Sequence, residues 1–597
     1  MANLYFSDKL QDHENSGFYA HYFNEDILAT NKKLLSLKQI ISENSSKWTN
    51  EFLDWHKELC RLGSENVEDW WLLPASRAIA FELPLLENLF FSLALIEKVE
   101  KENIDSLEVI GVPIEVFDFI KELKPEWSLK TSVSSKKNSP VVKLLDKLRS
   151  VKFLSFILLR SFLNSVKWDL AKPKGGVLLY SHLIHSTIFK ASGDHFFGNM
   201  FKNLERDFPV QWLFLSSLKK TSEASKLVRE LNSNGSSCYL IQNLINLKHI
   251  GLFYKSLFRI SKQLKNIENC LPSLKINKHY STRFPMLFFN HLAMEYKPFV
   301  ELEVYFSFKI YLTNSPVEII IYPYEEKGLE RAILKAAKGA EQAVLTMGYA
   351  HALHNDGHLY LSKKHYQNIN IPQPDYIATT GPSSRKWLSE KGFDNAEMID
   401  LGTKRYREDL GDIPKFFSDR ENCKKLKILF ICGLVTEASS FYNLIKDRPE
   451  TFKDCELVIR IYPFSHQTLQ NNYLGKIRKI LPQLQTDIGT LEQQVKKSDV
   501  VLFYSTSAGL EAILGGRLSV YLNLDSYFNL NPIDGKGEFP KRLVCENLQK
   551  LEETIQYISK LTTEEYTVLM KEQRVFAKNI YSPPEMKELR KLLNSHS

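Results

Sequence analysis

Short apolar runs alternate with amphipathic stretches along most of the chain. From residue 175 onward this pattern predicts buried strands, at 175–183, 210–218, 237–244, 317–324, 343–351, 374–381 and 396–402. The stretches between them favour helices, for example 196–206 and 325–340. Strands that alternate with helices build a parallel sheet covered by helices. The pattern therefore predicts an α/β domain over this part of the chain.

A polar segment, 408–424, interrupts the alternation, which then starts again. Further strands are expected at 425–434, 455–464, 499–507 and 518–524, and the last fifty residues are mostly helical and charged. The final helix of such an arrangement is expected to pack back on the first domain. Two open α/β domains in tandem face a cleft, and ligands bind at the carboxyl ends of their strands.

The region before residue 143 has a different pattern. Residues 1–65 favour amphipathic helix, followed by a helix, a short strand at 107–111 and a second helix. A Ser- and Lys-rich stretch at 128–142 is typical of a linker. The helix predicted at 143–168 is basic on one side and apolar on the other, so it fits either a packed domain helix or an in-plane membrane helix.

The expected division of the chain follows from these shifts in pattern. It comprises an N-terminal helical and αβ region, a linker, a first Rossmann-like domain, a second Rossmann-like domain and C-terminal helices, at 1–127, 128–142, 143–415, 416–560 and 561–597.

Composition narrows the class of protein. The 597 residues are 44% apolar and 25% charged, as in ordinary globular proteins, with a net charge of +8 that suits phosphate-bearing substrates or an anionic membrane surface. No nucleic-acid motif and no dense basic block are present. Seven scattered Cys, no apolar leader and no run of 18 apolar residues lead us to expect a cytoplasmic protein, with a peripheral membrane contact as a further option.

The clearest candidate site follows the strand predicted at 499–507. Ser505, Thr506 and Ser507 lie at the turn before a helix, where free N–H groups and hydroxyls can bind phosphate. Glu511 lies one turn further on, within reach of a ribose diol. Ordinary N-capping by these hydroxyls is the structural alternative. Arg460 and His466, at the end of strand 455–464, are further candidate phosphate contacts.

Two loops of the first domain carry candidate catalytic carboxylates. Glu325 directly follows strand 317–324, and Asp194 lies in the loop after strand 175–183, next to His195. A carboxylate facing the cleft can deprotonate an acceptor hydroxyl, although both residues also suit a helix N-terminus. Tyr349 and His351, together with His195, are candidate acceptor contacts.

Several chemistries lack their motifs. His351, His354 and His358 have no zinc-site spacing, so no metal and no cofactor are expected. The chain has no Asp-x-Asp pair and none of the glycine motifs of dinucleotide-binding enzymes, P-loop NTPases or serine hydrolases.

Several segments together resemble bacterial surface-carbohydrate biosynthesis proteins of the GT-B type, as found in O-antigen, lipopolysaccharide and capsule loci. They are WW-LLPASR, GDHFFG, YPYEEKGLER, GYAHALHN and LGTKRYR, and the STSAGLEAI segment is similar to the donor loop of sialyltransferase-like and polyol-phosphate-transferase-like enzymes. The likeness spans roughly residues 65–525. Relatives with His-Pro after the strand differ from the Tyr462-Pro463 of this chain, which leaves the phosphate contact to Arg460 or His466.

The resemblance implies a metal-independent glycosyltransferase with a GT-B fold. The donor is expected to be a nucleotide sugar, with a CMP-activated acidic sugar preferred, bound by the domain at 416–560. The acceptor is expected to be a glycan or lipid-linked glycan, bound by the domain at 143–415. Three alternatives remain open: a polyol-phosphate transferase, a non-catalytic carbohydrate-binding or scaffold protein, and a sugar-nucleotide epimerase.

Overall fold

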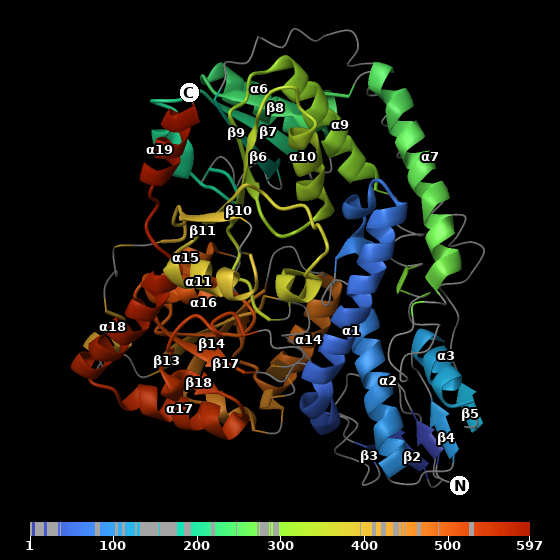
Figure 1. The fold of residues 1–597 in the computed structure, drawn as a ribbon. Coiled ribbons are helices and arrows are strands. Elements are labelled where there is room, and N and C mark those ends of the chain that lie inside the picture. Colours follow the sequence, from blue (N-terminus) through green and yellow to red (C-terminus); the bar gives the residue numbers. More distant parts are fainter. Residues whose placement is uncertain are drawn as a thin grey trace.

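The structure of the protein is a computed structural model. The structure describes residues 3–5, 17–20, 34–35, 38–77, 84–101, 106–109, 114–125, 128–131, 155, 176–183, 193–216, 221–245, 247–271, 274, 286, 288–289, 298–356, 358–393, 396–406, 408, 413–419, 425–433, 441–442, 444–446, 448–461, 467–486, 489–523 and 531–596. Two α/β domains dominate it, one above the other in Figure 1.

The first domain contains a seven-stranded sheet of order β12-β11-β10-β9-β6-β7-β8, in which every pair is parallel. Its strands are β6 (Val177–Leu183), β7 (Val210–Ser216), β8 (Ser237–Leu240), β9 (Ile319–Pro323), β10 (Leu345–Ala350), β11 (Tyr376–Thr379) and β12 (Glu397–Asp400). All seven strands predicted in this region are confirmed. In chain order the sheet begins 3-2-1-4-5-6, which is the Rossmann arrangement.

The second domain repeats this order in a six-stranded parallel sheet, β15-β14-β13-β16-β17-β18. Its strands are β13 (Leu426–Ile431), β14 (Cys455–Arg460), β15 (Gln485–Thr486), β16 (Val500–Phe503), β17 (Leu518–Leu522) and β18 (Val544–Cys545). The predicted fold of two Rossmann-like domains, the GT-B architecture, is therefore confirmed. The sequence pattern missed β15 and β18, because strands of two residues produce no alternation.

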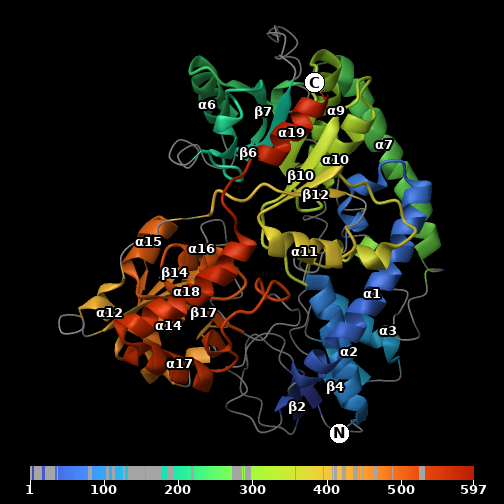
Figure 2. The same cartoon turned by 60° about the vertical axis from the view of Figure 1, so that its left-hand side comes forward.

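Helices cover both faces of the first sheet. On β6, Leu178 and Tyr180 join one core while Val177 and Leu179 join another, as the two-residue period of a strand requires. The first core also contains α7 (Leu247–Cys270), α9 (Phe299–Asn314) and α10 (Gly328–Lys338). The second contains α6 (Thr221–Ser233) and α19 (Lys587–His596), so the last helix of the chain packs on the first domain (Figure 2).

The remaining helices flank the second sheet or connect the domains. They are α11 (Pro382–Glu390), α12 (Lys415–Ser418), α14 (Gln467–Ile480), α15 (Leu491–Lys497), α16 (Ala508–Leu514), α17 (Leu548–Lys560) and α18 (Thr563–Ile580). Single 3-10 turns lie at Ile241–Asn243, Leu359–Leu361, Lys363–Tyr366, Pro449–Phe452 and Lys541–Leu543.

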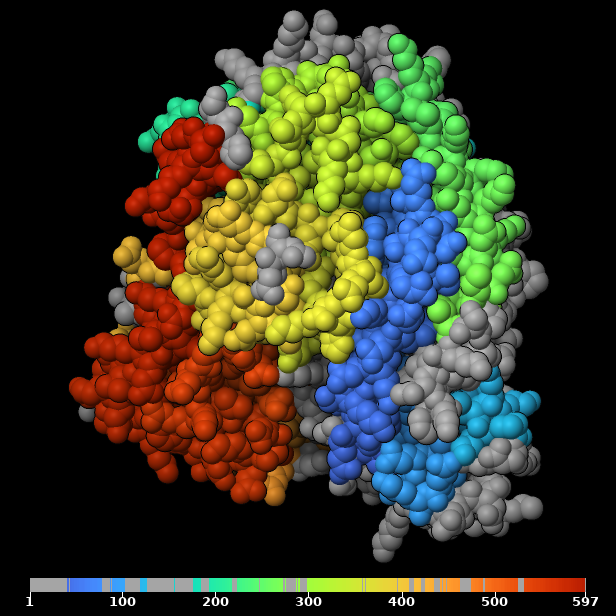
Figure 3. Space-filling view, viewed as in Figure 1, coloured from blue at the N-terminus to red at the C-terminus, as the bar shows by residue number. Residues whose placement is uncertain are grey.

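The N-terminal region shares the core of the first domain. α1 (Lys38–Asn66) and α2 (Pro84–Lys101) contribute buried side chains to the cluster that also holds α9 and α10. In the space-filling view α1, in blue, lies beside α7, in green (Figure 3). Two 3-10 turns, η2 (Trp70–Leu72) and η3 (Pro74–Ser76), connect α1 to the site described below.

The N-terminal residues are only partly as expected. The predicted helix begins at Lys38, and three short parallel strands precede it, β1 (Asn3–Tyr5), β2 (Gly17–Ala20) and β3 (Leu34–Leu35). The aromatic residues in β1 and β2 favour strand over helix. β4 (Ser106–Val109) and α3 (Ile114–Leu123) match the expected strand and helix, and the first four residues of the predicted linker form β5 (Ser128–Thr131).

Two further helix predictions have different outcomes. The helix expected at 196–206 is wrong: this segment contains only the 3-10 turn η4 (Met200–Asn203). The carboxylate of Asp194 binds the N–H groups of Phe196 and Phe197, and Gly198 has a positive φ of 58°, so the chain turns instead of continuing as a helix. The helix predicted at 143–168 lies outside the described residues, except for residue 155.

The chain crosses back from the second domain to the first immediately beside Gly402. Thr403 N–H donates to the carbonyl of Ser582 at 3.0 Å, and Ser582 N–H donates to the carbonyl of Thr380 at 2.8 Å. Gly402 has φ 69°, and a Cβ atom there would collide with the main-chain oxygen of Pro583. Only glycine fits this crossing without displacing the chain that leads into α19.

Replacing Gly402 should therefore loosen the crossing. We expect Gly402→Ala to lower the melting temperature clearly more than Gly235→Ala, which has a similarly positive φ of 90° but no atom within 4 Å of its Cβ position. The control measures the backbone cost alone, about 1–2 kcal/mol. Differential scanning calorimetry makes the comparison. Equal shifts for the two variants would contradict a crossing packed this closely.

Candidate functional site

The predicted site residues lie near the points where the strand order of each sheet reverses, between β6 and β9 and between β13 and β16. In the first sheet β6 and β9 are neighbours, and the loops that follow them carry Asp194 and Glu325. His351 directly follows the adjacent strand β10. In an open α/β sheet the loops beside such a switch point form the ligand crevice. The structure thus places these three residues, far apart in the sequence, at one edge of one sheet.

Aromatic contacts bring the loops after β6 and β10 together. The Phe196 ring centroid lies 4.9 Å from that of His195 and 4.6 Å from that of His351. Burial lowers the pKa of His195 to about 4, and Lys404, His351, Arg405 and Glu325 all lie close enough to influence it. His195 is therefore neutral at pH 7, at the centre of a cluster of charged side chains.

Glu325 and His351 form a pair at this edge. Glu325 Oε1 lies 3.4 Å from His351 Nε2, and Oε2 contacts the Lys327 ammonium. Burial alone would raise the pKa of Glu325, but the hydrogen bond from His351 and the positive charge of Lys327 outweigh it and keep this pKa well below its ordinary value. Glu325 is therefore an ionised carboxylate, and its side chain remains 24% exposed.

The other ring nitrogen of His351 has no partner among the described residues. His351 Nδ1 is buried and makes no hydrogen bond within that part of the chain, and its side chain is only 8% exposed. A carboxylate at one nitrogen fixes the orientation of an imidazole and leaves the other nitrogen for a substrate proton. The pair therefore has the geometry of a base held in place by a carboxylate.

The next residue, Glu326, faces the interior and anchors the loop. Its carboxylate accepts from Arg331 Nη2 at 2.9 Å and from the Tyr324 hydroxyl, and lies 2.7 Å from Lys363 Nζ. Its φ is 59°, a left-handed conformation that a non-glycine residue adopts only under constraint. Because Glu326 is fixed inward, its neighbour Glu325 is the partly exposed carboxylate of the loop, beside His351.

The N-terminal region supports this loop directly. Arg331 Nη1 donates to Ser76 Oγ at 2.5 Å, and its guanidinium lies over the Trp71 ring at 5.3 Å. Arg77 Nη2 donates to the main-chain oxygen of Glu325 at 3.2 Å. The segments WWLLPASR and YPYEEKGLER, which are 250 residues apart, thus form one packed unit.

Asp194 and Tyr349 lie deeper than the other candidates, and each is 1% exposed. Asp194 accepts from Ser181 Oγ at 2.6 Å and from two backbone N–H groups at 2.9 Å. Burial raises its pKa, although these hydrogen bonds oppose the shift. The Tyr349 hydroxyl donates to the carbonyl of Gly402 at 2.9 Å. The present contacts of both side chains are those of groups that position a loop.

The Ser-Thr-Ser turn of the second domain is contacted from the first domain by a residue that the sequence interpretation overlooked. Arg405 Nη1 donates to Ser507 Oγ at 2.5 Å and to the Tyr581 hydroxyl at 3.3 Å, and lies 3.6 Å from Glu511 Oε1. Arg405 follows β12, so its place after a predicted strand of the first sheet was the available signal. It connects the two domains at the ligand edge.

Lys404 connects the same segment to the loop after β6. Its ammonium donates to the carbonyl of Asp194 at 3.0 Å and to that of His195. Burial lowers the pKa of Lys404, whereas the carboxylate of Asp194 acts in the opposite direction. Lys327, Lys404 and Arg405 therefore place three cationic groups around the crevice.

The remaining residues predicted to bind the nucleotide are Ser505, Thr506, Arg460 and His466. Thr506 Oγ1 accepts from the N–H of Ala508 at 3.2 Å, as in N-capping, and Ser505 is half-buried at the same turn. Arg460 Nη1 donates to the carbonyl of Gly489 at 2.6 Å and to Gln494 Oε1 at 2.7 Å, so its guanidinium supports a neighbouring loop. His466 lies outside the described residues.

The domains also meet through a lysine of the second domain. Lys536 Nζ donates to the carbonyl of His354 at 2.5 Å and lies 4.8 Å from the centroid of the Trp387 ring, which stacks on His354. Burial lowers the pKa of Lys536 to about 8. Over the described ranges, no group of three His, Cys, Asp or Glu side chains is arranged to ligate a metal.

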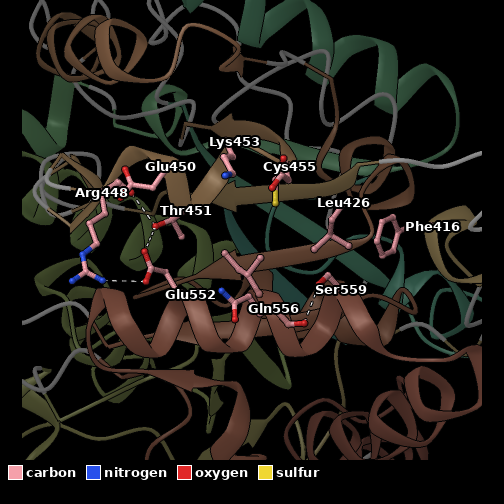
Figure 4. Close-up of a pocket in the computed structure, with 12 residues that line it drawn as sticks. Phe416, Leu426, Arg448, Glu450, Thr451, Lys453, Cys455, Glu552, Gln556 and Ser559 are labelled. Carbon is pink, nitrogen blue, oxygen red and sulfur yellow. Dashed lines mark hydrogen bonds and ion pairs between the residues drawn. The ribbon is translucent and has the colours of Figure 1, made fainter.

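A hollow in the second domain lies at the other edge of its sheet (Figure 4). It is lined by Leu426 and Cys455, the first residues of β13 and β14, and by Glu552, Gln556 and Ser559 of α17. Parallel α/β sheets bind ligands at the carboxyl ends of their strands. This hollow is thus on the side where such sheets do not bind their substrates.

No protein-family model matches the chain, and no curated protein matches its sequence. A glycosyltransferase from Rickettsia africae is similar in structure at 12% identity and a TM-score of 0.40, over 71% of this chain and 98% of that one. TarM from S. aureus, bound to UDP, is 11% identical over 71% and 100% of the two chains, with a TM-score of 0.40. Anabaena HepE with UDP and glucose is 9% identical over 70% and 100%, with a TM-score of 0.39.

None of the helices in the described ranges is long and apolar enough to span a bilayer.

The buried carboxylate of Glu326 makes a testable contribution to stability. Burial would raise its pKa, but Lys363 and Arg331 lower it to about 2, below the ordinary value of 4.5. A lowered pKa stabilises the fold above pH 4.5, and this stabilisation is lost as the pH falls toward 2. We expect Glu326→Gln to cost about 3–5 kcal/mol at pH 7, and the difference from the wild type to shrink below pH 4.5.

Urea titrations of the free energy of unfolding at pH 7, 5 and 3.5 measure this effect. The exposed residue Glu341 provides the matched control, since Glu341→Gln should change stability by less than about 0.5 kcal/mol at every pH. A Glu326→Gln difference that stays constant with pH would show that the carboxylate charge does not stabilise the loop.

Proposed function

We propose that this protein is a glycosyltransferase that moves a sugar from a nucleotide donor to a glycan acceptor at the edge where its two sheets meet. The observation that supports this most directly is the contact of Arg405, from the first domain, with Ser507 and Glu511 of the second. This contact is linked to the Glu325–His351 pair through His195, because Arg405, His351 and Glu325 all influence the pKa of that histidine. An anion-binding group beside a fixed base is what transfer from a phosphate-linked sugar requires.

The proposed chemistry assigns one task to each side of the cluster. His351 Nδ1, oriented by Glu325, takes the proton of the acceptor hydroxyl as that oxygen bonds to the anomeric carbon. The bond between the anomeric carbon and the donor phosphate breaks, and the nucleotide leaves with the electron pair. Arg405, with the hydroxyls of Ser505 and Ser507, stabilises the negative charge on the leaving phosphate.

The positive charge of the proposed anion site comes mainly from side chains and not from a helix N-terminus. α16 has only seven residues, so the helix dipole adds little beyond its first turn. The charge complementarity comes from Lys327, Lys404 and Arg405, and no metal is invoked. Arg405 has Ser507 and Glu511 as partners, and an incoming phosphate would replace them.

The finer assignments follow from the resemblance of the motifs. We propose a role in bacterial surface polysaccharide synthesis, a CMP-activated acidic sugar as donor, and a lipid-linked glycan as acceptor. Such an acceptor requires contact with the cytoplasmic face of a membrane. Transfer of a polyol phosphate would use the same anion site, and the choice of donor distinguishes the two reactions.

Nucleotide binding is the first test. We expect one of CMP, CDP, UDP or GDP to raise the melting temperature of the wild type, since a ligand that binds the native state stabilises it. Arg405→Ala, and Ser505→Ala combined with Ser507→Ala, should reduce that shift by more than half. Ser559→Ala, in the hollow at the opposite edge, is the matched control. The absence of any shift with folded protein would favour a non-catalytic carbohydrate-binding protein.

The proposed base can be tested separately from donor binding. We expect Glu325→Gln and His351→Gln to lower kcat by about 10²–10⁴-fold, while the thermal shift with nucleotide stays unchanged. Measurements of sugar transfer to a glycan acceptor supply kcat and KM. Asp194→Asn tests the alternative base: a larger loss of kcat there than in His351→Gln, at an unchanged melting temperature, would transfer the role of base from His351 to Asp194.

A further inference from the structure

The helix α7 has one face built into the protein and one face that is not. Ile250, Phe253, Ile260, Leu264 and Ile267 lie on its inner side and are buried in the core shared with α1 and α9. The helix is 24 residues long and runs along the outer edge of the molecule, on the right in Figures 1 and 3. Its packing against the first domain is therefore complete without its outer face.

The outer face of α7 carries large apolar side chains. Phe258 is 74% exposed, Leu252 49% and Leu247 42%. Among the described residues seven large hydrophobic side chains are this exposed, and three of them lie on this one helix. Single exposed apolar residues need no explanation, whereas three on the solvent-facing side of one helix form a surface that an apolar phase can cover.

Lysines share this face with the apolar residues. Lys255, Lys262 and Lys265 are exposed, and Lys255 and Lys262 are seven residues apart, so they lie along the same stripe of the helix. The only acidic residue of α7 is Glu268, near its end. Two acidic residues that follow α1, Glu68 and Asp69, are already paired with Arg259. Lys335 also contacts Asp69. The outer face is consequently positive and apolar.

We propose that the outer face of α7 docks in the plane of an anionic lipid bilayer. Phe258, Leu252 and Leu247 would enter the boundary between headgroups and acyl chains, and the lysines would contact anionic headgroups. A helix with lysines on its polar side and aromatic or aliphatic residues beside them is the form that such interfacial binding takes. This inference rests on the proposed function, since a lipid-linked acceptor lies at a membrane surface.

A bilayer fits this face better than a protein partner. A protein surface would have to match isolated apolar side chains that are separated by lysines along the length of the helix. An anionic bilayer presents negatively charged headgroups above apolar acyl chains over its whole surface. The lysines and the apolar side chains therefore find partners wherever the helix lies. The absence of acidic side chains from the exposed stripe removes the repulsion that anionic lipids would otherwise meet.

Vesicle co-sedimentation of the full chain tests the proposal. The vesicles contain phosphatidylcholine alone or mixed with phosphatidylglycerol. We expect binding to the mixed vesicles only. This binding should be weaker at high salt, because salt screens the attraction between the lysines and the anionic headgroups. Phe258→Asp, and Lys255→Glu combined with Lys262→Glu, should each weaken binding at least tenfold. Val575→Asp, at a 65% exposed position of α18, is the matched control and should bind like the wild type.

Failure of this inference is distinguishable from failure of the proposed function. Thermal shifts with nucleotide should be identical in the wild type and in all α7 variants, because α7 lies outside the nucleotide site. The proposal would be contradicted if the wild type did not bind anionic vesicles, or if the α7 variants bound them as tightly as the wild type. Loss of a dimer in Phe258→Asp without any vesicle binding would likewise overturn it, in favour of a second copy of this chain.

Discussion

The buried ion cluster of Glu326, Arg331 and Lys363 determines the conformation of the loop on which the site depends. Each of these residues is less than 7% exposed, so each charge is stable there only because the others are present. The cluster fixes a left-handed residue at the end of β9, and that turn leaves Glu325 partly exposed beside His351. Arg331 also binds the N-terminal segment through Ser76. The N-terminal region is thus a structural part of the candidate site.

A second constraint acts between the domains. Arg405 of the first domain has its partners in the second, and the chain crosses back beside it through Ser582 and Gly402. Under the proposed function, a phosphate bound at this turn would compete for Arg405 with Ser507 and Glu511, and so with a contact that joins the domains.

The sequence predicted the sheets better than the site. All eleven strands expected after residue 175 are present, because buried parallel strands leave continuous apolar runs that periodicity detects. Placement of Glu325, His351 and Asp194 at strand ends was also predictable from that pattern. The role of Arg405 was not, since its place after a predicted strand does not show that its partner is Ser507, 102 residues away. The helix expected at 196–206 failed for a related reason, because the side chain of Asp194 determines that turn.

The position of α7 is compatible with the domain movement that the proposed function requires. In Figures 1 and 2 α7 lies on the side of the first domain away from the second domain. A protein anchored to a bilayer through this helix would have its first domain, with the proposed base, fixed relative to the lipid surface. The second domain, which carries the Ser-Thr-Ser turn, would stay free to approach or withdraw with its nucleotide. Docking through the second domain would instead restrict the movement on which donor exchange and the exclusion of water depend.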